Sequence, residues 1–255
     1  MKIKRIESYE QLGGMITAQM KRGMVTNAFL SREDWEREIR HGVEFLLTEH
    51  GLLVFRNRSS HRVMSFWVND GFFDECPGLS NNTVCEIPMR TGDARTEAAV
   101  DGWIRAGFAF EFIRQRMASS SGGGEWDSSI RKAEIGDLET AEKLLRDNFS
   151  ALTGCLPGRD ELSHDISAGG VLLYGDTGLL HHRTAKNKSE LRHLCVAESA
   201  RGQGIGEKLV LGYHSLTLGM KRNVWVREDF APAKKIYEKC GYAADGMISR
   251  VLIRR

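Results

Sequence analysis

Apolar and polar positions form two patterned regions, and the second region has the clearer pattern. Its apolar runs are separated by turn residues and predict an antiparallel series of strands at 170–176, 178–185 and 190–198. A glycine-rich loop follows, and the next apolar residues recur at near-helical spacing: Leu209, Tyr213, Leu216 and Met220. Strands and helices in this order predict an α/β (α+β) fold with a mixed, mostly antiparallel central sheet flanked by helices.

The segment 118–128 separates the two regions. It is rich in Ser and Gly, lacks hydrophobic periodicity and predicts a flexible linker. We therefore expect a first domain at 1–117 and a second at 129–255. The two sides also share a pattern, because "FLLTEHGLLVFR" resembles "LLYGDTGLLHHR" around Gly51 and Gly178. A duplication explains this similarity, so we predict two tandem copies of one domain.

The loop in "VAESARGQGIGEKLV" precedes the predicted helix. A glycine-rich turn at the start of a helix leaves backbone N–H groups unpaired at the positive end of the helix dipole. Gly202, Gly204 and Gly206 allow a phosphate to approach closely, and Arg201 adds a positive charge. The loop lacks the GK[ST] ending of a P-loop and the glycine spacing of a Rossmann fingerprint. It therefore favours a pyrophosphate ligand, with a purely structural turn as the alternative.

Two motifs in correct order resemble the GNAT family of N-acetyltransferases. "LRHLCVAESARGQGIGEKLV" is similar to the acyl-CoA loop of that family, and "APAKKIYEKCGY" is similar to its second motif. The resemblance covers 129–255 and implies acetyl-CoA (coenzyme A) as the cofactor. It implies these cofactor-binding residues: Leu194, Cys195, Val196, Arg201, Gly202, Gln203, Gly204, Ile205, Gly206, Glu207 and Ala233. Phe230 departs from the pattern, because many members of the family have Asn there.

The first domain looks like a degenerate copy. It has no [QR]xxGxG sequence between 68 and 96, and Trp103 stands where the repeat places Tyr237. A copy without the glycine loop and the phenol is not expected to bind CoA as the family does. We therefore expect one active site, in the second domain. An unrelated N-terminal domain is the alternative, and it leads to the same expectation.

The resemblance implies direct acyl transfer from a thioester to an amine, in a cleft where two parallel strands splay apart. Backbone N–H groups from Leu194 to Val196 would then hold the carbonyl oxygen. Tyr237 is the candidate general acid, because a phenol can protonate a departing thiolate. The base stays open between Glu190, whose pKa burial could raise toward neutrality, and a histidine such as His193.

Strand periodicity separates the two candidate bases. With a period of two residues, Glu190 would share one face of its strand with Leu194, and His193 would share the other face with Leu191 and Cys195. Only one of those faces can meet the substrate. Cys195 lacks a surrounding Cys/His/Asn pattern, so we interpret it as a small buried residue and not as a nucleophile.

Composition narrows the range of partners. The net charge of +2 comes from nearly balanced charges, so no nucleic-acid partner is expected. The five cysteines include no CxxC pair, which argues against a structural metal and a disulfide framework. No apolar run is long enough for a membrane span, and the first residues lack the apolar region of a signal peptide. We expect a cytoplasmic protein with no membrane partner.

The sequence therefore predicts an acyl-CoA-dependent N-acyltransferase, most simply an acetyltransferase, whose acceptor is a small-molecule or peptide amine. We expect the acceptor to meet variable segments such as 153–165, and a homodimer is possible. One alternative is a CoA-binding regulatory or scaffold module without turnover. Another is an acyltransferase that uses a longer acyl chain or a carrier-protein thioester as donor.

Overall fold

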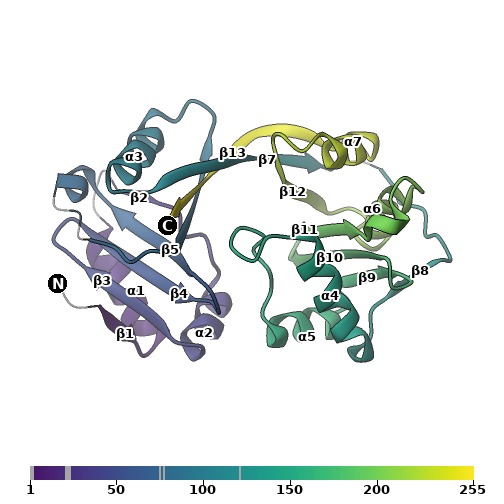
Figure 1. The fold of residues 1–255 in the computed structure, drawn as a ribbon, viewed down its shortest axis with the longest axis horizontal. Helices are drawn as coiled ribbons and strands as arrows, with labels where there is room; N and C mark the ends of the chain where they lie inside the picture. The colour runs from purple at the N-terminus through teal and green to yellow at the C-terminus, as the bar shows by residue number, and fades with distance from the viewer. Residues whose placement is uncertain (1–2, 21–23, 75, 77, 121) are drawn as a thin grey trace. The chain divides into compact units, whose positions relative to one another are not determined.

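A computed structural model describes residues 3–20, 24–74, 76, 78–120 and 122–255. The chain forms two compact units (Figure 1). Unit 1 comprises Met1–Ile113 and Ile248–Arg255, and unit 2 comprises Arg114–Met247. These limits differ from the predicted division, because two long strands each contribute residues to both units. They are β7 (Ala109–Ser119) and β13 (Ala243–Arg254).

Unit 1 has helices on both faces of a mixed sheet. Its elements are β1 (Lys4–Ile6), α1 (Tyr9–Gln19), β2 (Val25–Thr26), α2 (Arg32–Arg40), β3 (Val43–Leu47), β4 (Gly51–Asn57), β5 (Arg62–Val68), the 3-10 helix η1 (Asp70–Asp74), β6 (Thr83–Arg90) and α3 (Ala94–Arg105). The sheet order is β1-β3-β4-β5-β6-β13-β7, and β2 pairs with β5. Strands β5 and β6 form a parallel pair, and the other pairs of known direction, β1–β3, β3–β4, β4–β5 and β2–β5, are antiparallel. Helices α1 and α2 cover one face, and α3 covers the other (Figure 1).

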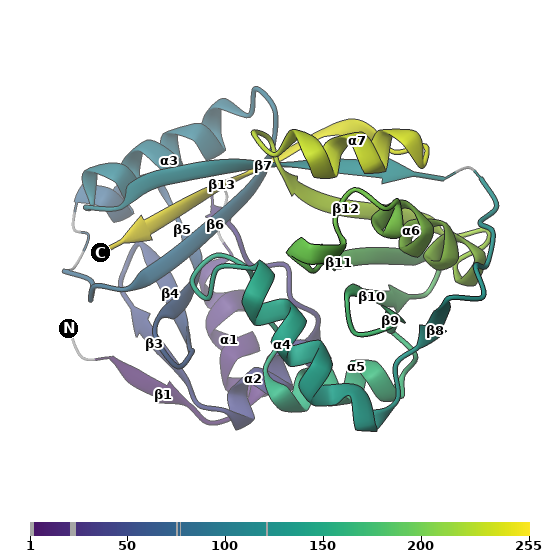
Figure 2. The same cartoon turned by 45° about the vertical axis from the view of Figure 1, so that its right-hand side comes forward.

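Unit 2 repeats this plan. Its elements are β8 (Ile130–Lys132), the 3-10 helix η2 (Ile135–Asp137), α4 (Leu138–Asn148), α5 (Arg159–Ser167), β9 (Val171–Tyr174), β10 (Gly178–Ala185), β11 (Lys188–Val196), the 3-10 helix η3 (Glu198–Ala200), α6 (Ile205–Leu216), β12 (Lys221–Arg227) and α7 (Ala231–Lys239). The sheet order is β7-β12-β11-β10-β9-β8, and the β11–β12 pair is parallel. Helices α4 and α5 lie on one face and α6 and α7 on the other (Figure 2). The predicted fold class is confirmed.

Helix α4 shows why the predicted elements shift at their ends. Its apolar face consists of Ala141, Leu144 and Leu145, which are buried against the sheet. The sequence pattern predicts a helix from Leu138 to about Leu152 with Asp137 as its N-cap, whereas the helix ends at Asn148. Phe149 adopts an extended conformation there, with φ −129° and ψ 145°. The chain then turns into the segment 149–158, which connects α4 to α5.

The Ser/Gly-rich segment belongs to unit 2 and contacts its helix α6. A Cβ on Gly124 would approach the carbonyl oxygen of Leu211 in α6 to 1.9 Å, so only glycine fits there. Asp127 forms an ion pair of 2.9 Å with Lys208 of the same helix. The segment was predicted as a flexible linker; Gly124 is closely packed, whereas a Cβ on Gly122 or Gly123 would meet open space. Of the predicted linker, Ser121 lies outside the described residues.

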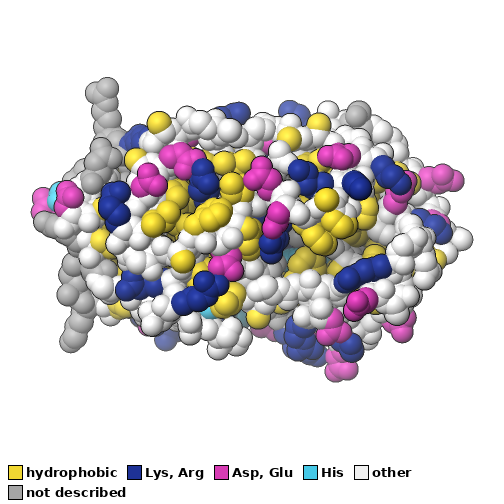
Figure 3. Space-filling view, turned by 45° about the horizontal axis from the view of Figure 1, so that its top comes forward, with side chains coloured by type: hydrophobic (Ala, Val, Ile, Leu, Met, Phe, Trp, Pro, Cys, Tyr) yellow, Lys and Arg dark blue, Asp and Glu magenta, His cyan; other side chains and the backbone are white. Residues whose placement is uncertain are grey.

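Charge is mixed on the molecular surface. Figure 3 shows Lys and Arg side chains interspersed with Asp and Glu over the face drawn, without a broad area of one sign. Within the described ranges, the helices are all too short or too polar to cross a membrane.

Candidate active site

The parallel strands of unit 2 separate halfway along their length. Their pairing runs from Lys188 opposite Lys221 to Leu191 opposite Val224. Strand β11 continues to Val196 without a recorded partner on its β12 side. Backbone groups along this stretch are therefore available to a ligand. We call this region the strand opening of unit 2.

The glycine loop lies between the end of β11 and helix α6. Gly202 and Gly204 have φ values of +81° and +76°, a left-handed conformation that disfavours other residues. A Cβ at either position would meet open space, so the backbone there is approachable. The first recorded bond of α6 runs from the N–H of Lys208 to the oxygen of Gly204. The preceding N–H groups of the first turn are thus free to bind an anion such as a pyrophosphate.

The other predicted cofactor residues have distinct surroundings. A Cβ on Gly206 would lie 3.0 Å from Cδ1 of Ile236 in α7, so this glycine serves helix packing and not phosphate approach. The guanidinium of Arg201 donates to the oxygen of Val196 at 3.2 Å and to Oδ1 of Asn148 at 3.0 Å. These hydrogen bonds connect the glycine loop to the end of β11 and to α4, while the Arg201 side chain remains exposed. The burial of the rest differs by position: Gln203 is exposed, Glu207, Leu194 and Ala233 are half-buried, and Ile205 is buried.

A β-bulge at Arg192 overturns the predicted alternation of faces. His181 pairs with His193 and His182 pairs with Leu191, so β11 carries one extra residue between these two pairs. Leu191 packs in the core beneath α6, whereas His193 contacts the segment between α4 and α5. They were predicted to share a face, and the bulge places them on opposite faces.

His193 and Glu190, the two candidate bases, differ in exposure. His193 is only 2% exposed, and burial lowers its pKa to about 3. Its Nε2 lies 2.9 Å from the oxygen of Gly154 and its Nδ1 lies 3.1 Å from Nδ1 of His181. The Glu190 side chain is 40% exposed and lies 3.9 Å from the guanidinium of Arg192, so it is not buried between strands. Of the two, only Glu190 is within reach of solvent.

Cys195 and Tyr237 are both buried. The Cys195 thiol faces the oxygen of Leu144 at 3.7 Å, and burial raises its pKa to about 12. A thiol with so high a pKa stays protonated and serves in packing. Of Cys195, only the backbone borders the strand opening. Tyr237 is 4% exposed and packs edge-on against Tyr242, with ring centroids 5.7 Å apart. Burial raises the pKa of its phenol above the ordinary value, so Tyr237 retains its proton.

Unit 1 has an equivalent strand opening, and a side chain of unit 1 occupies it. Strands β5 and β6 pair only at Arg62–Thr83 and Val63–Val84. Beyond this point the side chain of Asn27 bridges them. Its Nδ2 donates to the oxygens of Met64 (3.0 Å) and Glu86 (2.9 Å), and its Oδ1 accepts from the N–H of Phe66 (2.7 Å).

This arrangement indicates which backbone groups face the opening of unit 2. Phe66 lies opposite Leu53 in its hairpin, and Leu194 lies opposite Leu180 in the same relative register. Neighbouring residues of a strand direct their backbone groups alternately to its two sides. Leu194 therefore directs its N–H into the strand opening, where Phe66 directs its own. The sequence had no motif that could identify Asn27.

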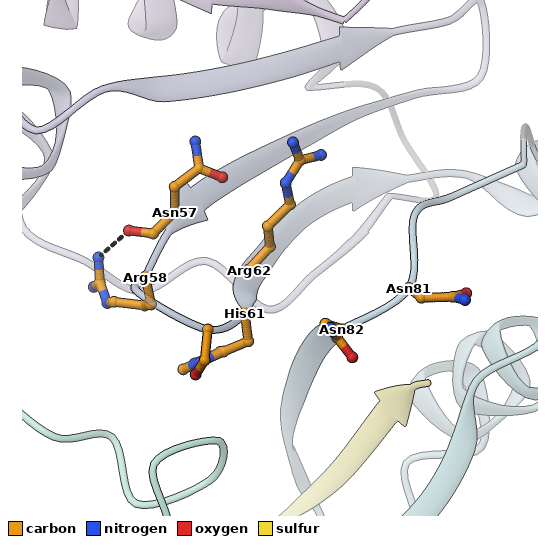
Figure 4. Close-up of a pocket in the computed structure, with 7 residues that line it drawn as sticks. Asn57, Arg58, His61, Arg62, Asn81 and Asn82 are labelled. Carbon is orange, nitrogen blue, oxygen red and sulfur yellow. Dashed lines mark hydrogen bonds between the residues drawn. The ribbon is translucent and has the colours of Figure 1, made fainter.

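A polar pocket of about 300 Å³ lies elsewhere, at the tip of the β4–β5 hairpin in unit 1. Figure 4 shows the side chains that line it: Asn57, Arg58, His61, Arg62, Asn81 and Asn82. Its cations already have partners, because Arg58 pairs with Glu38 at 2.6 Å and Arg62 pairs with Glu44 at 3.1 Å. We assign no ligand to this pocket.

The fold and the glycine loop of unit 2 are similar to those of acetyltransferase domains. Residues 166–244 match the acetyltransferase (GNAT) domain family. Among curated proteins, none matches this sequence significantly. The GNAT family match covers less than half of the chain, and unit 1 repeats the strand plan of unit 2 without a glycine loop of that sequence.

Solved structures share the fold over the whole chain. A GNAT-family acetyltransferase from Colwellia psychrerythraea has a TM-score of 0.58 at 14% identity, with 100% of each chain covered. A tandem GNAT protein from the clavulanic acid biosynthesis pathway has a TM-score of 0.60 at 10% identity, with 98% of this chain and 97% of that chain covered. A putative acetyltransferase from Pyrococcus horikoshii has a TM-score of 0.60 at 11% identity, with 100% and 89% covered.

Proposed function

We propose that unit 2 transfers an acetyl group from acetyl-CoA to a primary amine, and that unit 1 binds no acyl-CoA. The supporting observation is the glycine loop at the start of α6, which adjoins the unpaired end of β11. The loop offers N–H groups to a pyrophosphate, and Leu194 offers an N–H to a carbonyl oxygen. Acetyl-CoA has both groups and supplies the activated acetyl thioester.

Each step of the transfer has a candidate residue. The N–H of Leu194 would stabilise the negative charge that develops on the carbonyl oxygen as the C–N bond forms. Glu190, exposed on β11, would accept a proton from the amine directly or through water. Tyr237, neutral at working pH, would donate its proton to the sulfur as the C–S bond breaks. His193 is unsuited to the base role, because both ring nitrogens are engaged in a buried network.

Calorimetric titration with acetyl-CoA tests the proposal. Gly204→Glu places bulk and negative charge in the loop and should abolish binding. Gly219→Glu is the matched control, because Gly219 also has a positive φ of 75°, borders open space and follows the other end of α6. We expect wild type and the control to bind one acetyl-CoA per chain.

Two other outcomes would point to different functions. Binding without thiol release in the presence of diverse amines would favour the CoA-binding scaffold. No binding by wild type would overturn acetyl-CoA as the donor and favour a carrier-protein thioester.

A further inference from the structure

A buried chain of hydrogen bonds links α5 to the segment that follows α4. Oδ2 of Asp165 lies 2.8 Å from Nε2 of His181. Nδ1 of His181 lies 3.1 Å from Nδ1 of His193, and Nε2 of His193 lies 2.9 Å from the oxygen of Gly154. Both rings are at most 2% exposed. The contacts of His181 with Asp165 and with His193 are therefore buried, and the contact of His193 with Gly154 is partly buried.

Two neutral imidazole rings carry too few protons to form every contact of this series of hydrogen bonds. Each of the three contacts needs one proton, and the two end groups, a carboxylate and a carbonyl, can only accept. Two neutral imidazoles carry two protons in total. A third would make one ring an imidazolium, which burial and the nearby cations of Arg192 and Arg183 oppose by lowering the pKa of His181.

Asp165 determines the state of His181. Burial acts to raise the pKa of this carboxyl, but hydrogen bonds from His181 and Arg183 hold it at about 2, so Asp165 is a carboxylate. Arg183 in turn pairs with Glu161 at 2.6 Å, so the charges of this cluster are closely matched. A bond to a carboxylate is the strongest that His181 can donate, which places its proton on Nε2. Its Nδ1 is then an acceptor.

His193 is left with one proton and two acceptors on opposite sides of its ring. With the proton on Nε2 it binds the oxygen of Gly154, and two bare nitrogens face each other at the His181 contact. With the proton on Nδ1 it binds His181, and its bare Nε2 faces the Gly154 oxygen. Because a buried unmade hydrogen bond is costly, these two arrangements compete.

The hydrogen bond between His193 and Gly154 is one of several contacts that hold the segment 149–158. Gly154 donates its N–H to the oxygen of Ser150 at 2.7 Å, and a Cβ there would lie 2.5 Å from that oxygen, so the turn is tightly built. Arg114 of β7 donates to the oxygen of Thr153. Phe149 packs edge-on against the His193 ring, with centroids 5.0 Å apart. His193 and Arg114 thus hold a compact turn against the sheet.

We propose that His193 is a tautomeric latch, which holds the segment 149–158 when its proton is on Nε2 and releases it when the proton is on Nδ1. The segment 149–158 overlaps the residues predicted to bind the acceptor. The consequence of the latch for catalysis therefore rests on the proposed function of unit 2. A held segment would position the acceptor, and a released one would admit it. His193 is then a positioning residue and not the base.

Two matched deletions test the latch, because each removes one buried imidazole. In His181→Phe the remaining His193 has one acceptor only, so its proton stays on Nε2 and the segment is held. In His193→Phe the Gly154 contact is lost. We expect amide hydrogen exchange in 149–158 to slow about twofold in the first variant and to accelerate about tenfold in the second, the equivalent of one hydrogen bond. Exchange that accelerates in both variants would refute the latch and leave the histidines as packing groups.

Nitrogen-15 NMR of the imidazoles provides a second measurement. Wild type should show His193 exchanging between two neutral tautomers, and His181→Phe should show the Nε2–H form alone. A doubly protonated His181 at neutral pH would satisfy all three contacts and overturn the proposal. Neither measurement needs turnover, so a failure of the latch is distinguishable from a failure of acetyl-CoA binding. In an active enzyme, His193→Phe should raise the acceptor KM while the affinity for acetyl-CoA stays unchanged.

Discussion

Replacement of His182 tests whether a buried histidine makes the stability of this protein depend on pH. The residue lies in β10, is 6% exposed and packs against the ring of Tyr213 with centroids 4.9 Å apart. Neither ring nitrogen has a hydrogen-bond partner among the described residues. Burial lowers its pKa from 6.5 to about 4. Protonation is therefore easier in the unfolded chain than in the folded one.

The sign and size of the effect follow from this difference. The unfolded chain takes up a proton as the pH falls below 6.5, and the folded protein does so only near pH 4. Stability is thus fully present above pH 6.5 and declines as the pH falls toward 4. Between pH 7 and pH 5 the loss from His182 alone is about 2 kcal/mol. Replacement by Phe, which has a similar shape and no proton to gain, removes this loss.

Urea unfolding at pH 7 and pH 5 measures the prediction. The free energy of unfolding of His182→Phe, relative to that of wild type, should be about 2 kcal/mol larger at pH 5 than at pH 7. His164→Phe is the matched control, because it makes the same replacement at an exposed histidine of α5. If the difference between His182→Phe and wild type is the same at both pH values, then burial of His182 does not oppose its protonation and the reasoning fails.

Three further predictions concern the two strand openings. Tyr237→Phe should lower kcat about 100-fold and leave acetyl-CoA affinity unchanged, as thiol release and calorimetry would show; an unchanged kcat would assign the acid role elsewhere. Gly206→Leu should destabilise unit 2 by about 1–3 kcal/mol, because the new side chain meets Ile236, and a melting temperature at or above that of wild type would contradict this packing role. Asn27→Ala should cost about 2 kcal/mol or more in urea unfolding, since three buried backbone groups lose their partner, and it should create no second acetyl-CoA site.

Periodicity predicted the elements of the second half but not the register within them. The apolar runs and turns correctly indicated β9, β10 and β11, because each local pattern reflects which face is buried. The extra residue at Arg192 leaves no such pattern, since a bulge depends on pairing with the neighbouring strand. As a result Leu191 was assigned to the face of His193, whereas His193 and Cys195 share the face covered by α4 and α5 and Leu191 lies on the other. The unit boundary was displaced for a similar reason, because β13 completes a sheet far from it in sequence.

The glycine loop was identifiable because its chemistry is local, whereas the polar contacts around it join distant parts of the chain. Gly202 and Gly204 carry the positive φ values that the motif requires. Asp165 gave no comparable signal, because its importance comes from His181 in a different element. The sequence can show that a histidine is present in a strand, but only the fold shows that its two nitrogens compete for one proton.

The fate of the strand opening distinguishes the two copies of the fold. Parallel strands that separate leave backbone groups unpaired, and a buried unpaired group is costly. In unit 1, Asn27 supplies a carboxamide that accepts from Phe66 and donates to the facing strand, so that copy is complete without a ligand. In unit 2 the corresponding N–H of Leu194 lies beyond the last pair of β11 with β12, at Leu191 and Val224, and is directed to a site where a carbonyl could bind. A copy that lost the glycine loop could therefore keep its fold, provided that one of its own side chains took the place of the ligand.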